Sequence, residues 1–335
     1  MDILNSPWIT ICSDILAVLM IAVILMRSSR IWKKEPGYRL MRVMLFCNIA
    51  DALCNAVCYF LHDKSFAGAY ALALISQTIL EIAIVGILYH WLLFVDYRLY
   101  SSSDHLIRHY RIHFLPVPVF ILLHIVNGFT GILYTIDGSL RCERNMLYNV
   151  ILVIEYCYVV ISLVIIFRYR RENGSVRFFN AMPMVLPLVA AIAVSELTPQ
   201  SFIALGFASG LVSIYIYLKR SWKYDDEETG FYNSSYLEYI RTLEEKGIRG
   251  RDVMISISGE GDNEAVSGIL RQELPKDAEV IHMGEGRYLM VAGNKNKQFS
   301  KLVNTMLQDA VEEYNTGNPG KKIRIKADIV SGSDI

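Results

Sequence analysis

The chain has 335 residues, of which 53% are apolar and 20% are charged, and its formal net charge is zero. This balance, with no basic tract and no aromatic-interleaved basic patch, gives no indication of nucleic-acid binding. The six cysteines match neither a zinc-binding spacing nor a paired disulfide framework, although a bridge between Cys12 and Cys142 stays open. Apolar runs dominate up to about Leu218, and a mixture of charged and apolar residues follows from Tyr224. We therefore expect a membrane region followed by a soluble domain.

Seven apolar stretches precede Leu218. A stretch of about 20 apolar residues crosses the hydrocarbon core as a helix, because a helix satisfies its backbone groups internally. The first stretch has no basic residues before it and no small-residue cleavage site after it, which predicts an uncleaved helix rather than a signal peptide. The predicted spans are Trp8–Met26, Val43–Leu61, Tyr70–Phe94, Phe114–Ile136, Leu147–Phe167, Ala181–Leu197 and Phe202–Leu218.

Lysine and arginine are distributed unequally over the loops between these spans. The loops after the first, third, fifth and seventh stretches hold 16 of them between Arg27 and Lys223, whereas the opposite loops hold only Lys64, Arg141 and Arg144. Basic loops stay on the cytoplasmic side of a membrane. The sequence therefore predicts an N-terminus outside the cell and a cytoplasmic C-terminal domain.

Polar side chains occur at membrane depth in several of these spans, where they are costly and are candidates for function. In the second, third and fourth spans they recur at spacings that place them on one helix face, and the fifth span holds a single one. Three roles stay open: inter-helical hydrogen bonds, an outward-opening pocket for a small molecule or ion, and a proton or ion pathway. The candidates are Asn48, Asp51, Asn55, Gln77, Glu81, His124, Asn127 and Glu155.

The seventh span carries Gly206 and Gly210, a small-xxx-small spacing that lets two helices approach closely. The partner helix is expected either within the bundle or in a second copy of the chain.

The junction after the seventh span contains neither glycine nor proline from Lys219 to Glu228. We expect the helix to continue through it, which would make it a stiff lever between membrane and soluble domain. The basic residues around Trp222 would also suit an anchor at the membrane surface.

The soluble tail alternates helical and strand patterns. Helices are predicted at Tyr236–Lys246, Glu264–Glu273 and Gln298–Tyr314, and the remaining elements are strands. One strand covers Val253–Ser258, a hairpin joins Glu279–Met283 to Arg287–Ala292, and a last strand covers Ile323–Ile329. This order describes a small α/β domain of the palm type.

The tail opens with Asp226–Ser234, read D-E-E-T-G-F-Y-N-S. This stretch resembles the opening motif of bacterial diguanylate cyclase (GGDEF) domains, D-x-L-T-G-L-x-N-R, and departs from it at Glu228 and Ser234. The seven-helix half is similar to membrane sensors fused to such domains in Gram-positive bacteria. The resemblance implies a multi-domain protein of the bacterial cytoplasmic membrane, with a sensor-like domain over residues 1–222 and a shortened GGDEF-like α/β domain over 223–335.

Active cyclases of this family use two acidic positions to hold the divalent ions that align two GTP molecules. In this chain the first position falls on Ser256 and Ser258 at the end of a strand, and the second falls on Gly286. Because metal ions stabilise the attacking and leaving oxygens, losing their ligands removes the chemistry. The resemblance thus implies that the protein has no cofactor. Mg²⁺ and GTP are expected only if the chain is instead a divergent, active cyclase. The degenerate signature is Gly284, Glu285, Gly286, Arg287 and Tyr288.

A few tail residues are candidates for nucleotide binding. Asp262 matches the end of the family's guanine-reading run, but it would equally cap the following helix. Glu260 and Glu285 would hold metal only if the site shifted register, and Arg287 is either a phosphate ligand or a solvated hairpin residue. The family's inhibitory R-x-x-D is replaced by residues 275–278, so product feedback is not expected.

The hypothesis is a membrane signal-transduction protein whose seven helices receive a signal and whose impaired cyclase-like domain passes it on. The output would be contact with a second copy, an active cyclase or another signalling protein, or nucleotide binding without turnover. Two alternatives remain: a divergent active cyclase or nucleotidyl transferase, and a membrane binding module with a vestigial tail. The expected partners also include the lipid bilayer and a small-molecule ligand. No nucleic-acid partner is expected.

Overall fold

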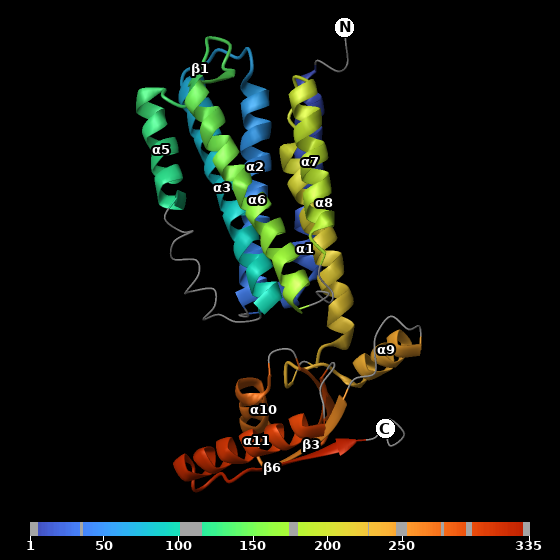
Figure 1. Ribbon diagram of the computed structural model, residues 1–335. Coiled ribbons are helices and arrows are strands. Elements are labelled where there is room, and N and C mark those ends of the chain that lie inside the picture. The colour runs from blue at the N-terminus through green and yellow to red at the C-terminus, as the bar shows by residue number, and fades with distance from the viewer. Residues whose placement is uncertain are drawn as a thin grey trace. The chain divides into compact units, whose positions relative to one another are not determined.

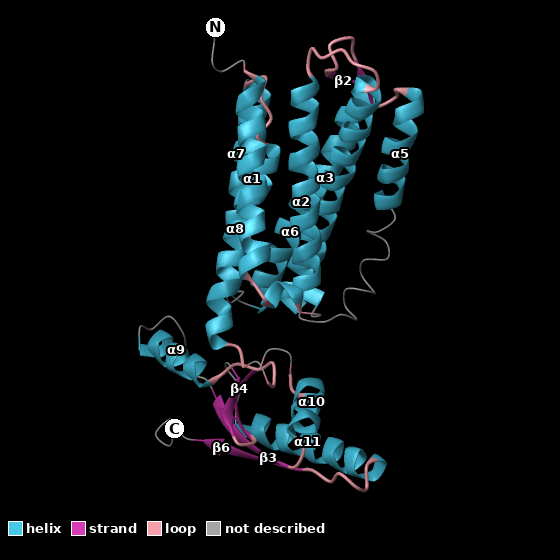
Figure 2. Cartoon of the chain, turned by 180° about the vertical axis from the view of Figure 1, so that it is seen from behind, coloured by secondary structure: helices cyan, strands magenta, loops and turns pink. Residues whose placement is uncertain are grey.

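The computed structural model describes residues 6–33, 36–100, 116–173, 180–226, 228–245, 253–275, 278–292 and 297–330. The chain divides into two compact units, Met1–Leu218 and Lys219–Ile335. The first is a helical bundle and the second combines helices with a sheet (Figures 1 and 2). All six cysteines lie in the described segments and are free thiols, Cys12 and Cys142 included.

The helical unit is built from long apolar helices in chain order. Five helices of the described residues are long and apolar enough to cross a membrane, and the apolar helices Val117–Thr130 and Met182–Leu197 are shorter. Length and composition thus indicate a membrane protein. The elements are α1 (Pro7–Arg27), η2 (Arg30–Trp32), α2 (Pro36–Leu61), α3 (Ala69–Tyr100), α5 (Pro116–Thr130), β1 (Tyr134–Ile136), β2 (Cys142–Arg144), α6 (Met146–Asn173), α7 (Met182–Leu197) and α8 (Ile203–Ser221).

Large apolar side chains are exposed on the outside of this bundle, as in a protein solvated by lipid. Phe129 is 90% exposed and Phe167 is 72% exposed, although soluble proteins bury such side chains. The interior is held partly by polar bonds: the Trp91 indole N–H donates to Ser162 Oγ at 2.9 Å and ties α3 to α6. Helix α3 packs against α2, α5 and α6 and so forms the centre of the unit.

The fourth apolar stretch is not helical to its end. Helix α5 stops at Thr130, and the residues predicted to complete the span form a turn and strand β1. Gly131 adopts φ +64° and its N–H donates to the Asn127 carbonyl at 2.9 Å, which ends the helix in a left-handed residue. The predicted span Phe114–Ile136 is therefore wrong beyond Thr130, and Phe114 itself lies outside the described residues.

Gly206 and Gly210 face α7 within the bundle. A Cβ on Gly206 would lie 2.5 Å from Ala191 Cβ, closer than a side chain permits, and one on Gly210 would lie 3.0 Å from Met184 Cα, tighter than most Cβ contacts. The two glycines therefore allow the close spacing between α7 and α8. Of the two partners that the sequence left open, the structure places a helix of the same chain against them.

The C-terminal unit has a β-α-β-β-α-β core preceded by a helix. Its four-stranded sheet has the order β4-β5-β3-β6 with antiparallel neighbours, the arrangement known as the split βαβ or ferredoxin-like fold. The elements are η3 (Trp222–Tyr224), α9 (Ser234–Glu245), β3 (Val253–Glu260), α10 (Asn263–Glu273), β4 (Glu279–Gly284), β5 (Arg287–Ala292), α11 (Lys297–Gly317) and β6 (Arg324–Val330).

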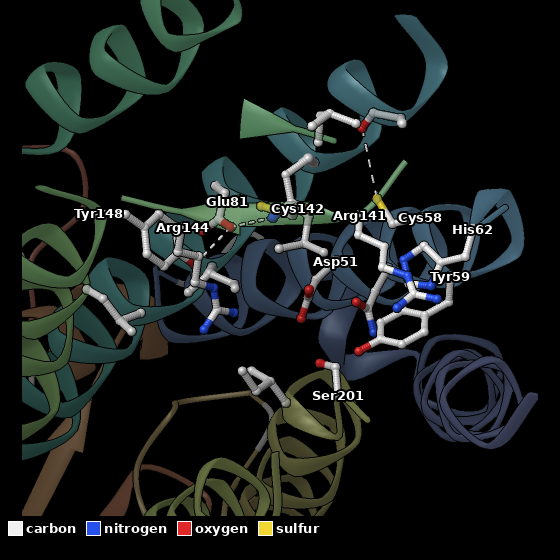
Figure 3. A pocket seen from close by; sticks show the side chains of 18 of the residues that line it. Asp51, Cys58, Tyr59, His62, Glu81, Arg141, Cys142, Arg144, Tyr148 and Ser201 are labelled. Atoms are coloured by element: carbon white, nitrogen blue, oxygen red, sulfur yellow. Dashed lines mark hydrogen bonds between the residues drawn. The ribbon is translucent and has the colours of Figure 1, made fainter. Parts of the chain in front are cut away.

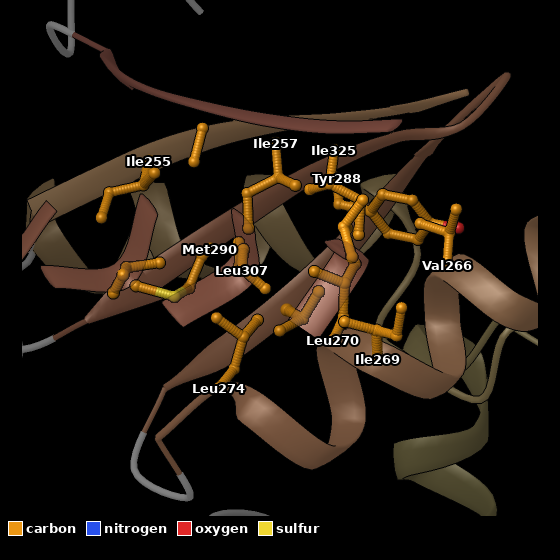
Figure 4. Close-up of a cluster of buried hydrophobic side chains, with 14 of the residues drawn as sticks. Ile255, Ile257, Val266, Ile269, Leu270, Leu274, Tyr288, Met290, Leu307 and Ile325 are labelled. Carbon is orange, nitrogen blue, oxygen red and sulfur yellow. The ribbon is translucent and has the colours of Figure 1, made fainter. Parts of the chain in front are cut away.

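The core of this unit lies between one sheet face and the helices α10 and α11 (Figure 4). Ile255 and Ile257 of β3 are fully buried in it, whereas Ser256 and Ser258 alternate onto the opposite face. Strand β3 runs two residues beyond the predicted end at Ser258, to Glu260.

The junction is not a continuous helix. Helix α8 ends at Ser221, a 3-10 turn covers Trp222–Tyr224, and Asp225 is extended with ψ 136°. The chain then turns because Asp226 N–H donates to the Phe231 carbonyl at 2.8 Å and Gly230 adopts φ +69°. The helix predicted through Glu228 is therefore wrong: local hydrogen bonds of the opening motif replace the helical ones.

Candidate functional site

A cavity of about 250 Å³ lies within the helical unit (Figure 3). Helices α2, α3, α6 and α7 and the β1–β2 hairpin all contribute to its wall. Four of the polar residues singled out in the sequence line it: Asp51, Asn55, Gln77 and Glu81. Their spacing along the sequence predicts that Asp51 and Asn55 share a face of α2 and that Gln77 and Glu81 share a face of α3. The packing of α2 against α3 brings the two pairs to one cavity.

Glu81 is held in place by two donors. The Gln77 side-chain amide donates to Glu81 Oε1 at 2.6 Å, and the Tyr148 hydroxyl donates to the same oxygen at 3.0 Å. The carboxyl group is almost fully buried. Glu81 is therefore a fixed acceptor on the cavity wall, oriented by residues of α3 and α6.

Asp51 has no comparable support. It is 2% exposed, and its Oδ2 accepts no hydrogen bond. The nearby Asn55 amide donates instead to Asp14 Oδ2 of α1, at 2.9 Å. Burying a carboxylate without a donor is costly unless a partner binds it. Asp51 Oδ2 is thus a buried acceptor on the cavity wall that no described residue satisfies.

Two arginines from the hairpin line the same cavity. The Arg144 guanidinium lies 4.9 Å from the centre of the Tyr148 ring, a cation–π contact. Arg141 lies 3.4 Å from the Asp63 carboxylate, and both side chains of that pair are more than half exposed. In the view of Figure 3, Asp51 lies between the two arginines. The cavity therefore has buried carboxyl groups at Asp51 and Glu81, exposed guanidinium groups at Arg141 and Arg144, and an exposed carboxylate at Glu196.

Two other titratable groups line the cavity near the hairpin. Burial lowers the pKa of His62, and the positive charge of Arg141 lowers it further, so the imidazole is neutral at pH 7. Burial raises the pKa of the Cys142 thiol to about 12, and the Glu81 carboxylate acts in the same direction. Cys142 is therefore a neutral thiol, which is neither a nucleophile nor a good metal ligand.

Four of the predicted membrane residues lie outside this cavity. The Asn48 amide donates to the Ala204 carbonyl of α8 at 3.1 Å, which is an inter-helical bond. Asn127 accepts from the Leu133 N–H at 2.7 Å and so supports the hairpin rather than a pocket. His124 and Glu155 form a buried pair with 3.7 Å between Nε2 and Oε1, apart from the cavity lining.

Sequence reasoning missed three residues that line the site, Arg141, Arg144 and Tyr148, and one that supports it from outside the lining, Asp14, which accepts from Asn55. Asp14 is an ionisable residue within the first apolar stretch, and its position at membrane depth was a usable signal. Arg141 and Arg144 entered the sequence analysis only as loop charges that indicate membrane orientation. The hairpin that folds them onto the cavity has no short sequence signature. Tyr148 carries no signal without knowledge of its contact with Glu81.

The degenerate signature forms the β4–β5 turn of the C-terminal unit. Glu285 and Gly286 occupy its two central positions with φ +50° and +69°, the pattern of a type I′ turn. The Gly286 carbonyl accepts from the Gly259 N–H at 2.7 Å, and a Cβ on Gly286 would lie 2.3 Å from the Gly259 carbonyl oxygen. Position 286 therefore has no room for a side chain of any kind.

At the other positions of the expected metal site, the described carboxylates are not grouped around a common point. Ser258 pairs with Arg287 across the sheet, while Glu260 and Glu285 are exposed, the latter with 90% of its side chain accessible. In the part of the chain that the structure describes, no three His, Cys, Asp or Glu residues are grouped so as to hold a metal ion.

Of the nucleotide-binding candidates, Asp262 has a structural role and Arg287 lies on the surface. Asp262 caps α10, because its carboxylate accepts from the Glu264 N–H at 3.0 Å. Arg287 is largely exposed and lies 3.8 Å from Glu285 Oε2. Tyr288 is buried and stacks on His282 with ring centres 5.1 Å apart.

The opening motif folds into a compact loop against β4. The Asp226 carboxylate accepts from the Glu228 N–H at 3.1 Å and from the Thr229 hydroxyl at 2.9 Å, and it also contacts His282 Nδ1. Partial burial alone would raise the pKa of Asp226, but these hydrogen bonds outweigh it, so the pKa lies below its ordinary value. Arg271 of α10 donates to the Thr229 carbonyl at 2.5 Å. The motif therefore has a structural use that requires no nucleotide.

Comparison with models of known protein families finds no match, and no curated protein matches the chain.

Proposed function

We propose that this protein is a membrane signal-transduction protein, in which a seven-helix sensory region acts on a cyclase-like domain that has lost its catalytic groups. Helices α5 and α7 would complete the seven spans, with the N-terminus outside and the C-terminal unit in the cytoplasm of a bacterial cell. The charge asymmetry of the loops supports this orientation.

The observation that carries the proposal is the buried cavity with an unpartnered carboxyl group. Asp51 lines a space enclosed by helices from distant parts of the sequence, and its Oδ2 has no hydrogen bond. A bundle that needed only stability would place an apolar residue there, since burying a polar group without a hydrogen bond is costly. A ligand that supplied the missing donor would change how these helices pack, which is what a sensor requires.

The second support comes from the C-terminal unit. The order β-α-β-β-α-β with a glycine-rich hairpin beside the end of β3 agrees with the fold implied by the cyclase resemblance. Gly286 stands where that family carries a metal-binding acid, and the Gly259 carbonyl closes the position. We infer output by protein contact or by nucleotide binding without turnover.

The test is cyclic-di-GMP formation by the full-length protein in lipid nanodiscs, with GTP and either Mg²⁺ or Mn²⁺. The expected result is no product above background, together with a ligand-dependent change in amide hydrogen exchange of the C-terminal unit. Robust synthesis that Glu260→Ala or Glu285→Ala abolishes would overturn the proposal and establish a divergent cyclase. Unchanged exchange with a ligand bound would overturn the signalling role.

A further inference from the structure

The charged groups around the cavity lie at different depths. Asp51 and Glu81 are at most 2% exposed, whereas the Arg141 side chain is 59% exposed and Arg144 is also exposed. The carboxyl groups of Asp51 and Glu81 therefore occupy the enclosed wall. The two guanidinium groups line the cavity at exposed positions, together with the exposed carboxylate of Glu196 from α7. A ligand that fills this space meets both signs of charge at once.

Ligands of a single charge do not suit this arrangement. An anion would pair with the arginines but would bring its charge close to Asp51 and Glu81, which lie in a poorly solvated wall. A cation would pair with the carboxyl groups but would face two guanidinium groups. A divalent metal ion lacks a grouped set of ligands among the described residues. A molecule with a positive and a negative group satisfies both sides.

The size of the cavity limits the ligand further. Its volume is about 250 Å³, below the roughly 300 Å³ at which pockets for drug-sized molecules begin. The polar groups fixed on its wall are few, and Glu81 is already occupied by Gln77 and Tyr148. Asp51 is the buried acceptor that remains without a donor at Oδ2.

We propose that this cavity binds a small zwitterion of amino-acid size, with its ammonium group at Asp51 and its carboxylate at Arg141 and Arg144. Ammonium and carboxylate groups form charge-assisted hydrogen bonds with these partners. The exposed pair between Arg141 and Asp63 is weak enough to exchange for the ligand carboxylate. This inference rests on the proposed sensor function and names the class of molecule that it detects.

The experiment is isothermal titration calorimetry on the full-length protein in nanodiscs. The probes are alanine, glutamine and γ-aminobutyrate, each with its N-acetyl derivative, which lacks the positive charge, and its amide, which lacks the negative charge. At least one amino acid should bind at least about tenfold more tightly than both of its derivatives, because each derivative loses one charged contact. Binding by no amino acid, or equal binding by a singly charged derivative, overturns the inference.

Variants of the cavity residues test whether the amino acid binds in this cavity. Asp51→Asn and Arg144→Gln should each weaken binding at least about tenfold, whereas Glu143→Gln, on the same strand but outside the cavity lining, should not. Unchanged affinity in both cavity variants overturns the inference. Arg144 lies on the exposed side, so its variant keeps the test valid if Asp51→Asn does not fold. Binding without any change in the C-terminal unit counts against the signalling function alone and leaves the ligand class standing.

Discussion

The Asp226 carboxylate contacts the imidazole of His282, a residue 56 positions later in the chain. This contact joins the loop that opens the C-terminal unit to strand β4. Backbone bonds reinforce it on both sides of Tyr232, whose N–H donates to the Val280 carbonyl and whose carbonyl accepts from the His282 N–H at 2.7 Å. The segment that follows the last membrane helix is therefore attached to the edge strand of the sheet.

Replacing Asp226 with asparagine should loosen this attachment. The substitution removes the charge from three hydrogen bonds, and we expect a loss of about 1–3 kcal/mol in the stability of the loop. The measurement is amide hydrogen exchange of β4 in the full-length protein. Asp309→Asn, at an exposed position of α11, is the control and should leave exchange unchanged. Equal protection of β4 in both variants would show that the contact contributes nothing.

The same carboxylate predicts a response to acid. Its pKa lies below the ordinary value of 3.8, so the folded state favours the ionised form. The stabilisation is present in full above that value and is lost as the pH falls through the lower folded-state pKa. Protection of β4 should therefore fall below about pH 4 in the native protein. The acid-dependent part should be missing from Asp226→Asn, and an identical acid profile in the two proteins would exclude Asp226 as its source.

The glycines of the β4–β5 turn allow the steric limit at position 286 to be tested. Gly286→Ala would place a Cβ 2.3 Å from the Gly259 carbonyl oxygen, whereas a Cβ on Gly284 would meet no atom within 4 Å. Both residues have positive φ, so both variants carry a strain of about 1–2 kcal/mol. The difference between them in denaturant unfolding reports the steric contact alone.

Gly286→Ala should be less stable than Gly284→Ala by about 1–3 kcal/mol, as for other overpacked positions. Gly286→Asp, which places an acidic residue where the proposed resemblance expects a metal ligand, should be destabilised in the same way and should form no cyclic-di-GMP. Equal stability of the two alanine variants, or cyclase activity in Gly286→Asp, would contradict the steric argument.

Local patterns in the sequence predict most elements, and the failures have identifiable causes. The tail strands and helices follow from periodicity, since Ile255 and Ile257 alternate with serines along β3. The junction helix was predicted from the absence of glycine and proline before Glu228. It was wrong because the side chain of Asp226 competes for backbone N–H groups, and composition alone does not show this.

The candidate cavity was only half predictable. Spacing on α2 and α3 identifies Asp51 and Glu81 as buried polar residues on helix faces. Their convergence, and the approach of Arg141 and Arg144, depend on how the β1–β2 hairpin folds over the bundle, with Tyr134 opposite Arg144. Such contacts between distant segments leave no periodic trace in one sequence.

The stability of the ligand-free protein distinguishes a ligand-binding role of Asp51 from a structural one. If Asp51 serves a ligand, its buried carboxyl group lowers the stability of the empty protein. Asp51→Asn, which keeps the shape and replaces the carboxyl group with an amide, should then raise the stability of the ligand-free protein by about 1–3 kcal/mol. The measurement is thermal unfolding in nanodiscs. Glu81→Gln is the matched comparison and should lower stability, because Glu81 accepts from Gln77 and Tyr148. Destabilisation by Asp51→Asn would assign Asp51 to the support of the bundle instead.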